Sequence, residues 1–443
     1  MKSPRLRCQI GAFTTMILLA LATTGAQAVS YDEVLAWVAR YADAPADALA
    51  PGPYGRDRIG DLAAYLPVGY VDEFDFDALA LDIVPSANYT PHPVYVEATE
   101  QFAGTASVGS NGTLEGYTAG RPFSPEQILA AAPGVAGYMV AWNHIRRWQN
   151  VGYRNESTIA YIQPTADGAA GELLDGMHGG GHVERSLSMY YHRVYLSGIA
   201  SKADEDYRLD VAGSDELLFK EYIEMLAPFD IAGLKLVIER PLDQSLGDQV
   251  NSYLPTERRV RRLSSKERSD SWLGTNWTLD DFEGYSGLVM DNDWRFIGRK
   301  VVLHVASSRN SRPEFHGPMS TIPLDRWQLR PCYVVEAVPR WKDHPYGRRL
   351  IFIDQQTYSV AMTLVFDRDE TLTKVMTTMY EYSDELENPP LDQSTPRWRA
   401  SIVINKLDNS ANIGAAAGPT EFVDVKPSQV RRIFSVSNLT GGR

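Results

Sequence analysis

Cysteine is nearly absent from this sequence: Cys8 and Cys332 are the only two in 443 residues. Cys8 lies in an N-terminal leader that we expect to be removed, so Cys332 alone remains and no intrachain disulfide can form. Cys8 also precedes the apolar part of that leader, whereas the cysteine of a lipoprotein follows it. A chain of this length can bury a large core, so it needs no disulfides even in an oxidising compartment.

Long apolar runs are also scarce, and the main one covers residues 10–22. Basic residues precede this run and Ala26-Gln27-Ala28 follows it, which is the pattern of a secretory signal peptide. The run is nearer to a signal core than to the ~20 residues that a membrane span needs. We therefore predict a cleaved signal peptide over residues 1–28, and no later stretch is apolar for long enough to span a bilayer.

Basic residues are fewer than acidic ones. The sequence holds 43 Lys and Arg residues against 56 Asp and Glu residues, which gives a net charge of -13 at pH 7. Loss of the leader removes three basic residues and no acidic one, which lowers the charge to -16. A nucleic-acid partner is excluded because phosphate backbones need a basic face. The sequence also has no coiled-coil pattern, so we expect a monomer.

Motifs of catalysis are missing: there is no Gly-x-Ser-x-Gly and no Walker-type phosphate loop. Asp280 and Asp281 are adjacent in a turn, where acids are more typical of caps and ion pairs than of acid/base couples. His178, His182 and His192 are the only group with metal-like spacing, but three glycines separate the first two histidines. We predict a protein that is not an enzyme and that has no metal site and no cofactor.

Residues 29–156 form a helical and loop-rich segment in this interpretation. Apolar spacing predicts a helix over residues 31–41, after which several prolines interrupt the pattern. Residues 90–125 are rich in Gly, Thr, Ser and Pro and predict a turn-rich loop. We expect this segment to wrap around the rest of the protein without a core of its own.

Two helices are expected at the end of that segment. Ser124 can cap a short helix that has Pro125 at its first position. Residues 137–150 have the strongest helical pattern in the chain, with His144 and Trp148 four residues apart on one side.

Residues 157–443 are expected to form a β meander that makes one domain with the N-terminal segment. Val, Ile, Tyr, Thr and Leu recur in short runs without helices of crossover length between most of them, which favours antiparallel pairing. One face of this sheet is apolar, and the N-terminal helices are the available cover. The predicted strands are 157–163, 186–197, 217–224, 234–240, 249–254, 294–304, 333–338, 349–354, 359–367, 372–380 and 397–404.

Several short motifs, in this order, resemble those of one proteobacterial periplasmic family. It is the domain of unknown function 1329 family, often labelled outer-membrane lipoprotein-sorting protein-like, and the resemblance covers nearly all of the mature chain. The motifs are Phe123, Trp142-Asn143-His144, the strand that runs into residues 258–262, Asp280-Asp281-Phe282 with Gly287, residues 293–300 and residues 334–337.

The resemblance implies an α+β, mostly β fold like that of the lipoprotein carriers Lol-A and Lol-B. Such a fold is a strongly curved antiparallel sheet, an incomplete barrel, with helices covering its concave face around an apolar cavity. We therefore expect a non-catalytic periplasmic carrier or chaperone for a hydrophobic ligand, either a lipid or the acyl chains of a lipidated protein. The alternative is an accessory or sensory module that binds an inner-membrane transporter or a signalling partner.

Aromatic rings are the first candidates for the ligand site. They could line an apolar cavity, since pocket walls are mostly apolar and aromatic, or they could fill an ordinary core. His144 is placed with them, at the cavity or its rim. The aromatic candidates are Trp142, Trp148, Trp272, Trp277 and Trp294.

A run of arginines provides the second set of candidates. On a strand, Arg258 and Arg262 would point to one face and Arg259 and Arg261 to the other, so neither face would be ordinary core. Guanidinium groups pair with phosphate and carboxylate, which favours contact with an anionic headgroup or a partner. The other interpretation is a solvated strand edge whose arginines pair with the acids of residues 280–283.

Overall fold

The computed structural model describes residues 28–441, apart from positions 43, 150, 167, 311, 383–393 and 424. The predicted signal peptide therefore lies outside the described residues, except for its last position. Within the described chain, one sheet of 16 strands dominates the fold and the helices are short. None of those helices combines the length and the apolar character that crossing a membrane requires.

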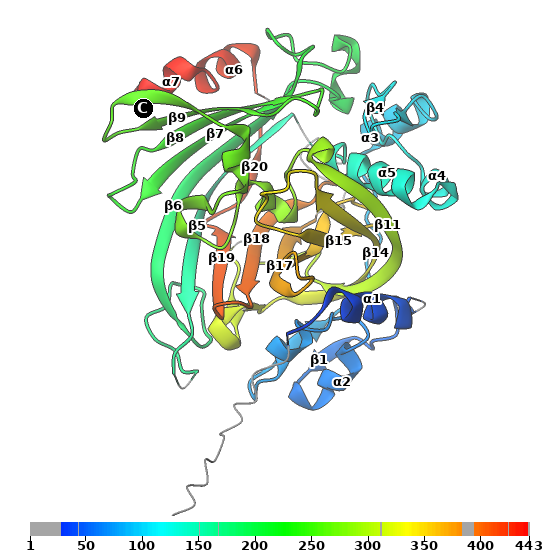
Figure 1. Ribbon diagram of the computed structural model, residues 1–443, viewed down its shortest axis with the longest axis vertical. Helices are drawn as coiled ribbons and strands as arrows, with labels where there is room; N and C mark the ends of the chain where they lie inside the picture. Colours follow the sequence, from blue (N-terminus) through cyan, green and yellow to red (C-terminus); the bar gives the residue numbers. More distant parts are fainter. Residues whose placement is uncertain are drawn as a thin grey trace, which may run out of the picture.

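A first antiparallel run of strands begins the sheet in chain order. Each strand pairs with the next one along the chain. The strands are β5 (Gly152–Gln163), β6 (His182–Tyr195), β7 (Leu217–Ala227), β8 (Lys235–Pro241), β9 (Gln249–Leu254) and β10 (Arg259–Leu263). Figure 1 shows this run as the green half of the sheet.

A second antiparallel run follows and joins the first. Its strands are β11 (Asn292–His304), β14 (Arg326–Pro339), β15 (Arg348–Asp354), β16 (Val360–Phe366), β17 (Leu372–Glu381), β18 (Arg397–Asn405) and β19 (Ser410–Ala416). The last strand, β19, pairs with β5, with Ile413 opposite Ala160. The expected single meander is therefore two meanders, and β5, the first strand of the first meander, lies in the interior of the sheet between β19 and β6.

The sheet is mixed and open rather than purely antiparallel. Strand β2 (Leu81–Ile83) pairs in parallel with the start of β14, and β1 (Gly52–Tyr54) pairs with β2. A short β20 (Glu421–Phe422) lies beside β5. Among the described residues, β10 pairs only with β9 and β11 only with β14, so the sheet curves without closing (Figure 1). Two small hairpins lie apart from it: β3 (Ser107–Val108) with β4 (Leu114–Glu115), and β12 (Phe315–His316) with β13 (Ile322–Pro323).

The predicted strands agree with β5 to β9, β11 and β14 to β18, with ends that differ by up to seven residues, the largest difference being at the start of β14. Strand β19 was not predicted. Its residues are mostly Ala, Ser, Gly and Asn, which have little preference for strands, and its position between β18 and β5 stabilises it.

One face of the sheet is covered by residues 29–83. Helix α1 (Tyr31–Arg40) confirms the helix predicted over 31–41 and begins with a capping box between Ser30 and Glu33. Its buried side chains Val34 and Trp37 pack with residues of β14 to β19 in one core. A short helix α2 (Ile59–Leu62) and two turns, η1 (Arg56–Arg58) and η2 (Val71–Phe74), complete this cover.

The region predicted as a turn-rich loop, residues 90–125, contains a helix at residues 93–101, so that prediction is wrong there, whereas residues 102–124 are mostly turns and bends. Helix α3 (Pro93–Gln101) has proline at its first position, and the His92 side chain accepts a hydrogen bond from the Val94 amide. Its Tyr95 and Ala98 are buried, so packing stabilises a helix that local composition did not indicate.

The two helices predicted next are present. Helix α4 (Pro125–Ala130) begins with the predicted Ser124 cap, which forms a capping box with Gln127. Helix α5 (Pro133–Ile145) starts and ends earlier than predicted. Because α5 ends before Trp148, His144 and Trp148 do not share a helix face, and that expectation is wrong.

The opposite face of the sheet is covered by α5 and by residues 264–291, which we call the strap. Neighbouring residues of β15 separate the two faces: Leu350 and Phe352 join the core under α1, whereas Ile351 and Ile353 join the core under α5. The strap has no strand and contains only short turns of helix. These are η4 (Ser265–Ser269), η5 (Trp272–Gly274), η6 (Leu279–Gly284) and η7 (Val289–Asp291).

Two C-terminal helices were missed because residues 157–443 were interpreted as strands. Helices α6 (Pro427–Ile433) and α7 (Val436–Thr440) bury Val430, Phe434 and Leu439 against the far end of the first meander. Figure 1 shows both helices, in red, above β7, β8 and β9. Turns η3 (Ala200–Glu205) and η8 (Pro318–Ser320) lie in connections between strands.

Candidate functional site

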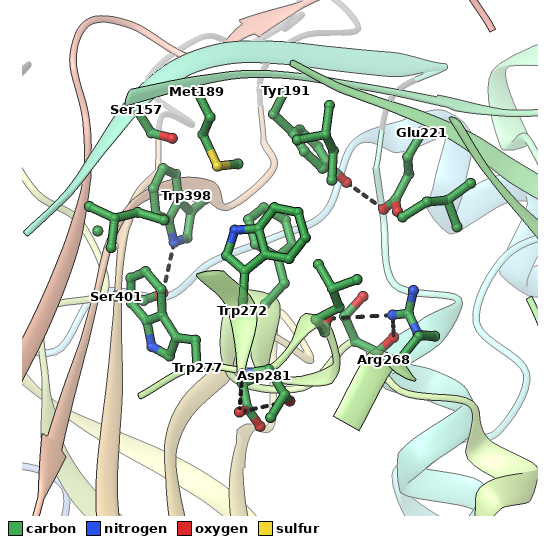
Figure 2. Close-up of a pocket in the computed structure, with 18 residues that line it drawn as sticks. Ser157, Met189, Tyr191, Glu221, Arg268, Trp272, Trp277, Asp281, Trp398 and Ser401 are labelled. Atoms are coloured by element: carbon green, nitrogen blue, oxygen red, sulfur yellow. Dashed lines mark hydrogen bonds between the residues drawn. The ribbon is translucent and has the colours of Figure 1, made fainter. Parts of the chain in front are cut away.

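A small apolar pocket lies between the strap and the sheet. It has a volume of about 60 Å³. The sheet contributes residues of β5 to β8, β18 and β19, and the strap closes the other side (Figure 2). Its apolar walls are formed by Ile159, Met189, Tyr191, Ile223, Ile238, Trp272, Trp277, Leu279, Phe282 and Trp398.

The strap places its aromatic rings directly against the strands. In Figure 2, Trp272 lies beneath Met189 and Tyr191, and Trp277 lies below Trp398, on the side of Ser401. Trp272 and Trp277 are only partly buried, unlike the strand residues around them. The aromatic side of this pocket therefore belongs to a segment that no strand pairing ties to the sheet.

Buried ion pairs fix the turn at η6 to its surroundings. Asp280 pairs with Arg268 at 2.9 Å, and Asp281 pairs with Arg349 at 3.2 Å. Glu283 pairs with Arg147, and both of these side chains are only 8% exposed. Such pairs are costly to break because the charge left behind stays buried.

Further hydrogen bonds hold the same turn. The Tyr346 hydroxyl donates to Asp281 at 2.7 Å, and the Tyr153 hydroxyl donates to Glu283 at 3.1 Å. Thr278 closes the turn through its amide and its hydroxyl, both of which donate to Asp281. The acids at 280–283 therefore anchor the strap, and the expectation that they pair with the arginines at 258–262 is wrong.

Glu221 is an acidic group in the apolar wall, and its charge is compensated. Its Oε1 accepts hydrogen bonds from the Tyr191 hydroxyl at 2.5 Å and from Arg193 Nε at 2.8 Å. Burial acts to raise the pKa of Glu221, but the Arg193 guanidinium holds that pKa below its usual value. The pocket therefore presents no uncompensated charge at this position.

The predicted aromatic residues do not gather in one cavity. Trp272 and Trp277 line the pocket under the strap. Trp142 and Trp294 are buried near α5, where each indole Nε1 donates to a main-chain carbonyl oxygen. Trp148 is buried in a separate cluster beside α3. Residues that the prediction left out, above all Trp398, Phe282 and Met189, complete the pocket.

His144 lies outside the lining of this pocket and joins two segments. Its Nδ1 is 2.8 Å from the Tyr358 carbonyl oxygen, and its Nε2 is 3.0 Å from the Tyr285 carbonyl oxygen. Burial lowers the pKa of His144 to about 3, and the two carbonyl oxygens act against that shift. His144 thus links α5 to the end of η6 and to the turn before β16.

The arginines at 258–262 lie on or next to β10, at one end of the sheet. All four side chains are exposed. Arg261 pairs with Glu257 at 2.7 Å, and Arg259 lies 3.4 Å from the same carboxylate. They form a solvated edge of the sheet. In the strand order, β10 is far from β18 and β19, which line one wall of the pocket.

The histidines with metal-like spacing have different surroundings. At the surface, His178 Nε2 lies 3.8 Å from the Glu314 carboxylate. The His192 ring packs against Phe434, which follows α6 and belongs to the core cluster under α6 and α7. Across the described part of the chain, no three His, Cys, Asp or Glu side chains are grouped so that they could hold a metal ion.

The protein is therefore a mostly β protein in which one large sheet and a strap enclose a small apolar pocket. The chain belongs to the family described as protein of unknown function (DUF1329), whose model matches residues 61–409. The family resemblance predicted from the sequence motifs is confirmed. No curated protein matches the chain.

The solved structures to which the chain is similar include proteins from three bacteria. A DUF1329 family protein from Desulfovibrio piger is 15% identical, with 70% of this chain and 100% of that chain covered and a TM-score of 0.46. A protein described as an outer membrane lipoprotein-sorting protein domain, from Vibrio parahaemolyticus, is 14% identical, with 68% and 97% covered and a TM-score of 0.44. A LolA superfamily protein from Nitrosomonas europaea is 11% identical, with 68% and 97% covered and a TM-score of 0.37.

Proposed function

We propose that this protein is a non-catalytic carrier or chaperone that holds a hydrophobic ligand under the strap. The observation that carries the proposal is the apolar pocket, whose walls include Trp272, Trp277, Phe282 and Trp398. The pocket is covered by the strap, which no strand pairing holds to the sheet. Pockets for apolar ligands have walls of this kind. The ligand class is a lipid or the acyl chains of a lipidated protein.

The need for such a carrier follows from the cost of exposing an acyl chain to water. At about 0.8 kcal/mol per methylene, a chain of roughly fifteen methylenes costs on the order of 12 kcal/mol to leave in water. The signal-peptide pattern of residues 1–28 supports an aqueous compartment outside the inner membrane, the periplasm, as the place of action.

Binding requires the strap to move. The pocket volume of about 60 Å³ is smaller than the roughly 150 Å³ of a protein cavity that accepts benzene. A chain can enter only if Trp272 and Trp277 withdraw from the sheet. In this proposal the strapped face is the concave face of an incomplete barrel, and the ion pairs at η6 form the hinge on which the aromatic part of the strap, residues 271–278, moves.

Bound molecules test the proposal directly. The protein is expressed with its leader, purified from the periplasm without detergent and extracted with organic solvent, and the extract is analysed by mass spectrometry. A lipid or another apolar compound at a stoichiometric level is the expected result. A protein that is empty and that also fails to take up a fluorescent fatty acid in solution would contradict the carrier function.

A second candidate function is a partner-binding module, which the edge at β10 favours. This strand has one neighbour among the described residues and carries exposed arginines at 258, 259, 261 and 262. An exposed edge can pair with a strand of another protein, and the arginines would suit an acidic segment of a membrane transporter or signalling partner. Crosslinking from a residue placed at position 260 would capture that partner, whereas the carrier function predicts no stable complex there.

A further inference from the structure

A second and larger hollow is lined in part by Met290, at the C-terminal end of the strap. It has a volume of about 460 Å³ and shares no lining residue with the apolar pocket. Its walls come from the β3–β4 hairpin region, from α5 and the residue that follows it, and from the connections after β6 and β8. Its lining is largely polar, which distinguishes it from the pocket under the strap.

Arg146 is a buried cation in the wall of this hollow. The residue is 8% exposed, and its guanidinium lies 4.6 Å from the centre of the Tyr117 ring. Its Nε has no hydrogen-bond partner, and the groups near enough to influence its charge, within the described chain, are tyrosines and no carboxylate. Burial lowers the pKa of Arg146, as expected for a cation without a counter-ion.

Gln244 supplies a second donor without a partner in the same wall. The residue is 2% exposed, and its Oε1 accepts a hydrogen bond from the Val289 amide at 2.8 Å. That bond fixes the orientation of the amide group, and Nε2 is left without a hydrogen-bond partner among the described residues. Both residues line the hollow, and buried donors are normally paired, so these two donors need an acceptor that the described residues do not supply.

The chain around Arg146 is built to hold the guanidinium in place. Gly198 has a φ of +71°, and a Cβ at this position would lie 3.1 Å from Arg146 Nη1 and 3.2 Å from the Tyr117 ring. A larger residue would therefore press on the stacked pair. Glycine allows the connection after β6 to pass close to it.

The rim of the hollow has a different charge pattern from its buried wall. Asp206, Asp243 and Arg208 line it and are exposed to solvent. Two acids at the rim disfavour a ligand that is negative at both ends, and they accept hydrogen bonds from hydroxyl or amino groups.

We propose that this hollow binds a small organic anion, a carboxylate or a phosphate monoester, whose oxygens accept hydrogen bonds from Arg146 and Gln244. The guanidinium fork matches the geometry of both oxyanions. The remainder of the ligand is neutral or cationic and faces Asp206 and Asp243. This site does not depend on the carrier function proposed for the apolar pocket.

Paired probes test the proposal. Binding of gluconate is compared with that of glucose, and binding of glycerol 3-phosphate with that of glycerol, by isothermal titration calorimetry at matched ionic strength. We expect at least one anion to bind and its neutral counterpart not to bind, and the anion that binds identifies the carboxylate or the phosphate class. Arg146→Met should weaken that binding by roughly tenfold or more, the value of a hydrogen bond to a charged group.

Two further variants make the result decisive. Gln244→Glu keeps an acceptor for the Val289 amide but replaces the free donor with a carboxylate oxygen, so it should also weaken anion binding. Arg312→Met removes an exposed positive charge elsewhere and should leave binding unchanged. The proposal is overturned if neither anion binds better than its neutral counterpart, or if Arg146→Met and Gln244→Glu bind the anion as tightly as the unaltered protein.

Discussion

Trp277 of the strap packs directly on the backbone of Gly414 in β19, so closely that a Cβ at position 414 would overlap the indole ring. Gly414 is not in a left-handed conformation, so this contact, and not the backbone, is what requires glycine. The position of the strap on the sheet therefore depends on a strand residue that has no side chain.

Gly414→Ala should displace Trp277 and loosen the aromatic part of the strap. Overpacking of this kind costs about 1–3 kcal/mol of unfolding free energy. Tryptophan fluorescence should shift to longer wavelength as the ring becomes more exposed, and urea unfolding measures the loss of stability. Gly418→Ala is the matched control, since a Cβ at position 418 meets nothing within 4 Å. Equal behaviour of the two variants would contradict the contact.

Asp281→Ala should destabilise the protein strongly. The substitution leaves the Arg349 guanidinium, which is 1% exposed, without its carboxylate, and removes the acceptor of the Tyr346 hydroxyl. Loss of one partner of a buried pair costs about 3–5 kcal/mol. Urea unfolding measures the effect. Glu257→Ala breaks an exposed pair with Arg261 and should cost less than about 1 kcal/mol. A small effect at Asp281 would mean that its ion pair does not anchor the strap.

Ser157→Leu should block the apolar pocket. Ser157 lines the pocket from β5, and the larger side chain would occupy much of the free volume of about 60 Å³. We expect the amount of co-purified lipid, or the uptake of a fluorescent fatty acid, to fall severalfold while the protein still folds. The control is Thr158→Leu, which places the same side chain on the other face of the strand. Undiminished binding by Ser157→Leu would place the ligand elsewhere.

Stability should fall as the pH is lowered from about 7.5 to about 5. Burial lowers the pKa of His144 to about 3 and that of His192, His304 and His344 to about 4. An unfolded histidine has a pKa of about 6.5, so in this range the unfolded chain binds more protons than the folded one. Asp291, whose pKa burial raises to about 6, acts in the opposite direction but is a single group.

Urea unfolding at several pH values in this range checks the sign of that slope. The carboxylates with lowered pKa values, such as Glu221 and Asp248, contribute only at lower pH, so they do not confuse the test. A stability that stayed constant or increased toward pH 5 would show that the histidines are not buried as neutral rings.

Strand positions were predictable because they follow from local residue preference and alternation. The run around β16, for example, contains only apolar or β-branched residues. Helix α3 and strand β19 were not predictable in this way, because packing of Tyr95 in the first case and pairing with β5 in the second stabilise them.

The candidate site was predictable only in part. The sequence drew attention to Trp272 and Trp277 among the aromatic rings that could line an apolar cavity, and both line the pocket. Trp398, Gly414 and Met189 could not be identified, since nothing in their local sequence indicates which strands lie opposite the strap. Arg146 carried no signal either, because a charged residue at a helix end is normally exposed.

The sequence by itself determined the family, the predominance of strands and the capped helices α1 and α4, because these depend on short motifs, alternation and local hydrogen bonds. Only the tertiary structure decided that β19 pairs with β5, that the strap covers one face, and that Asp281 meets Arg349 rather than the arginines near 260. These contacts join segments that are far apart in the chain. The packing of the whole sheet decides which segments meet, and a local sequence pattern does not predict it.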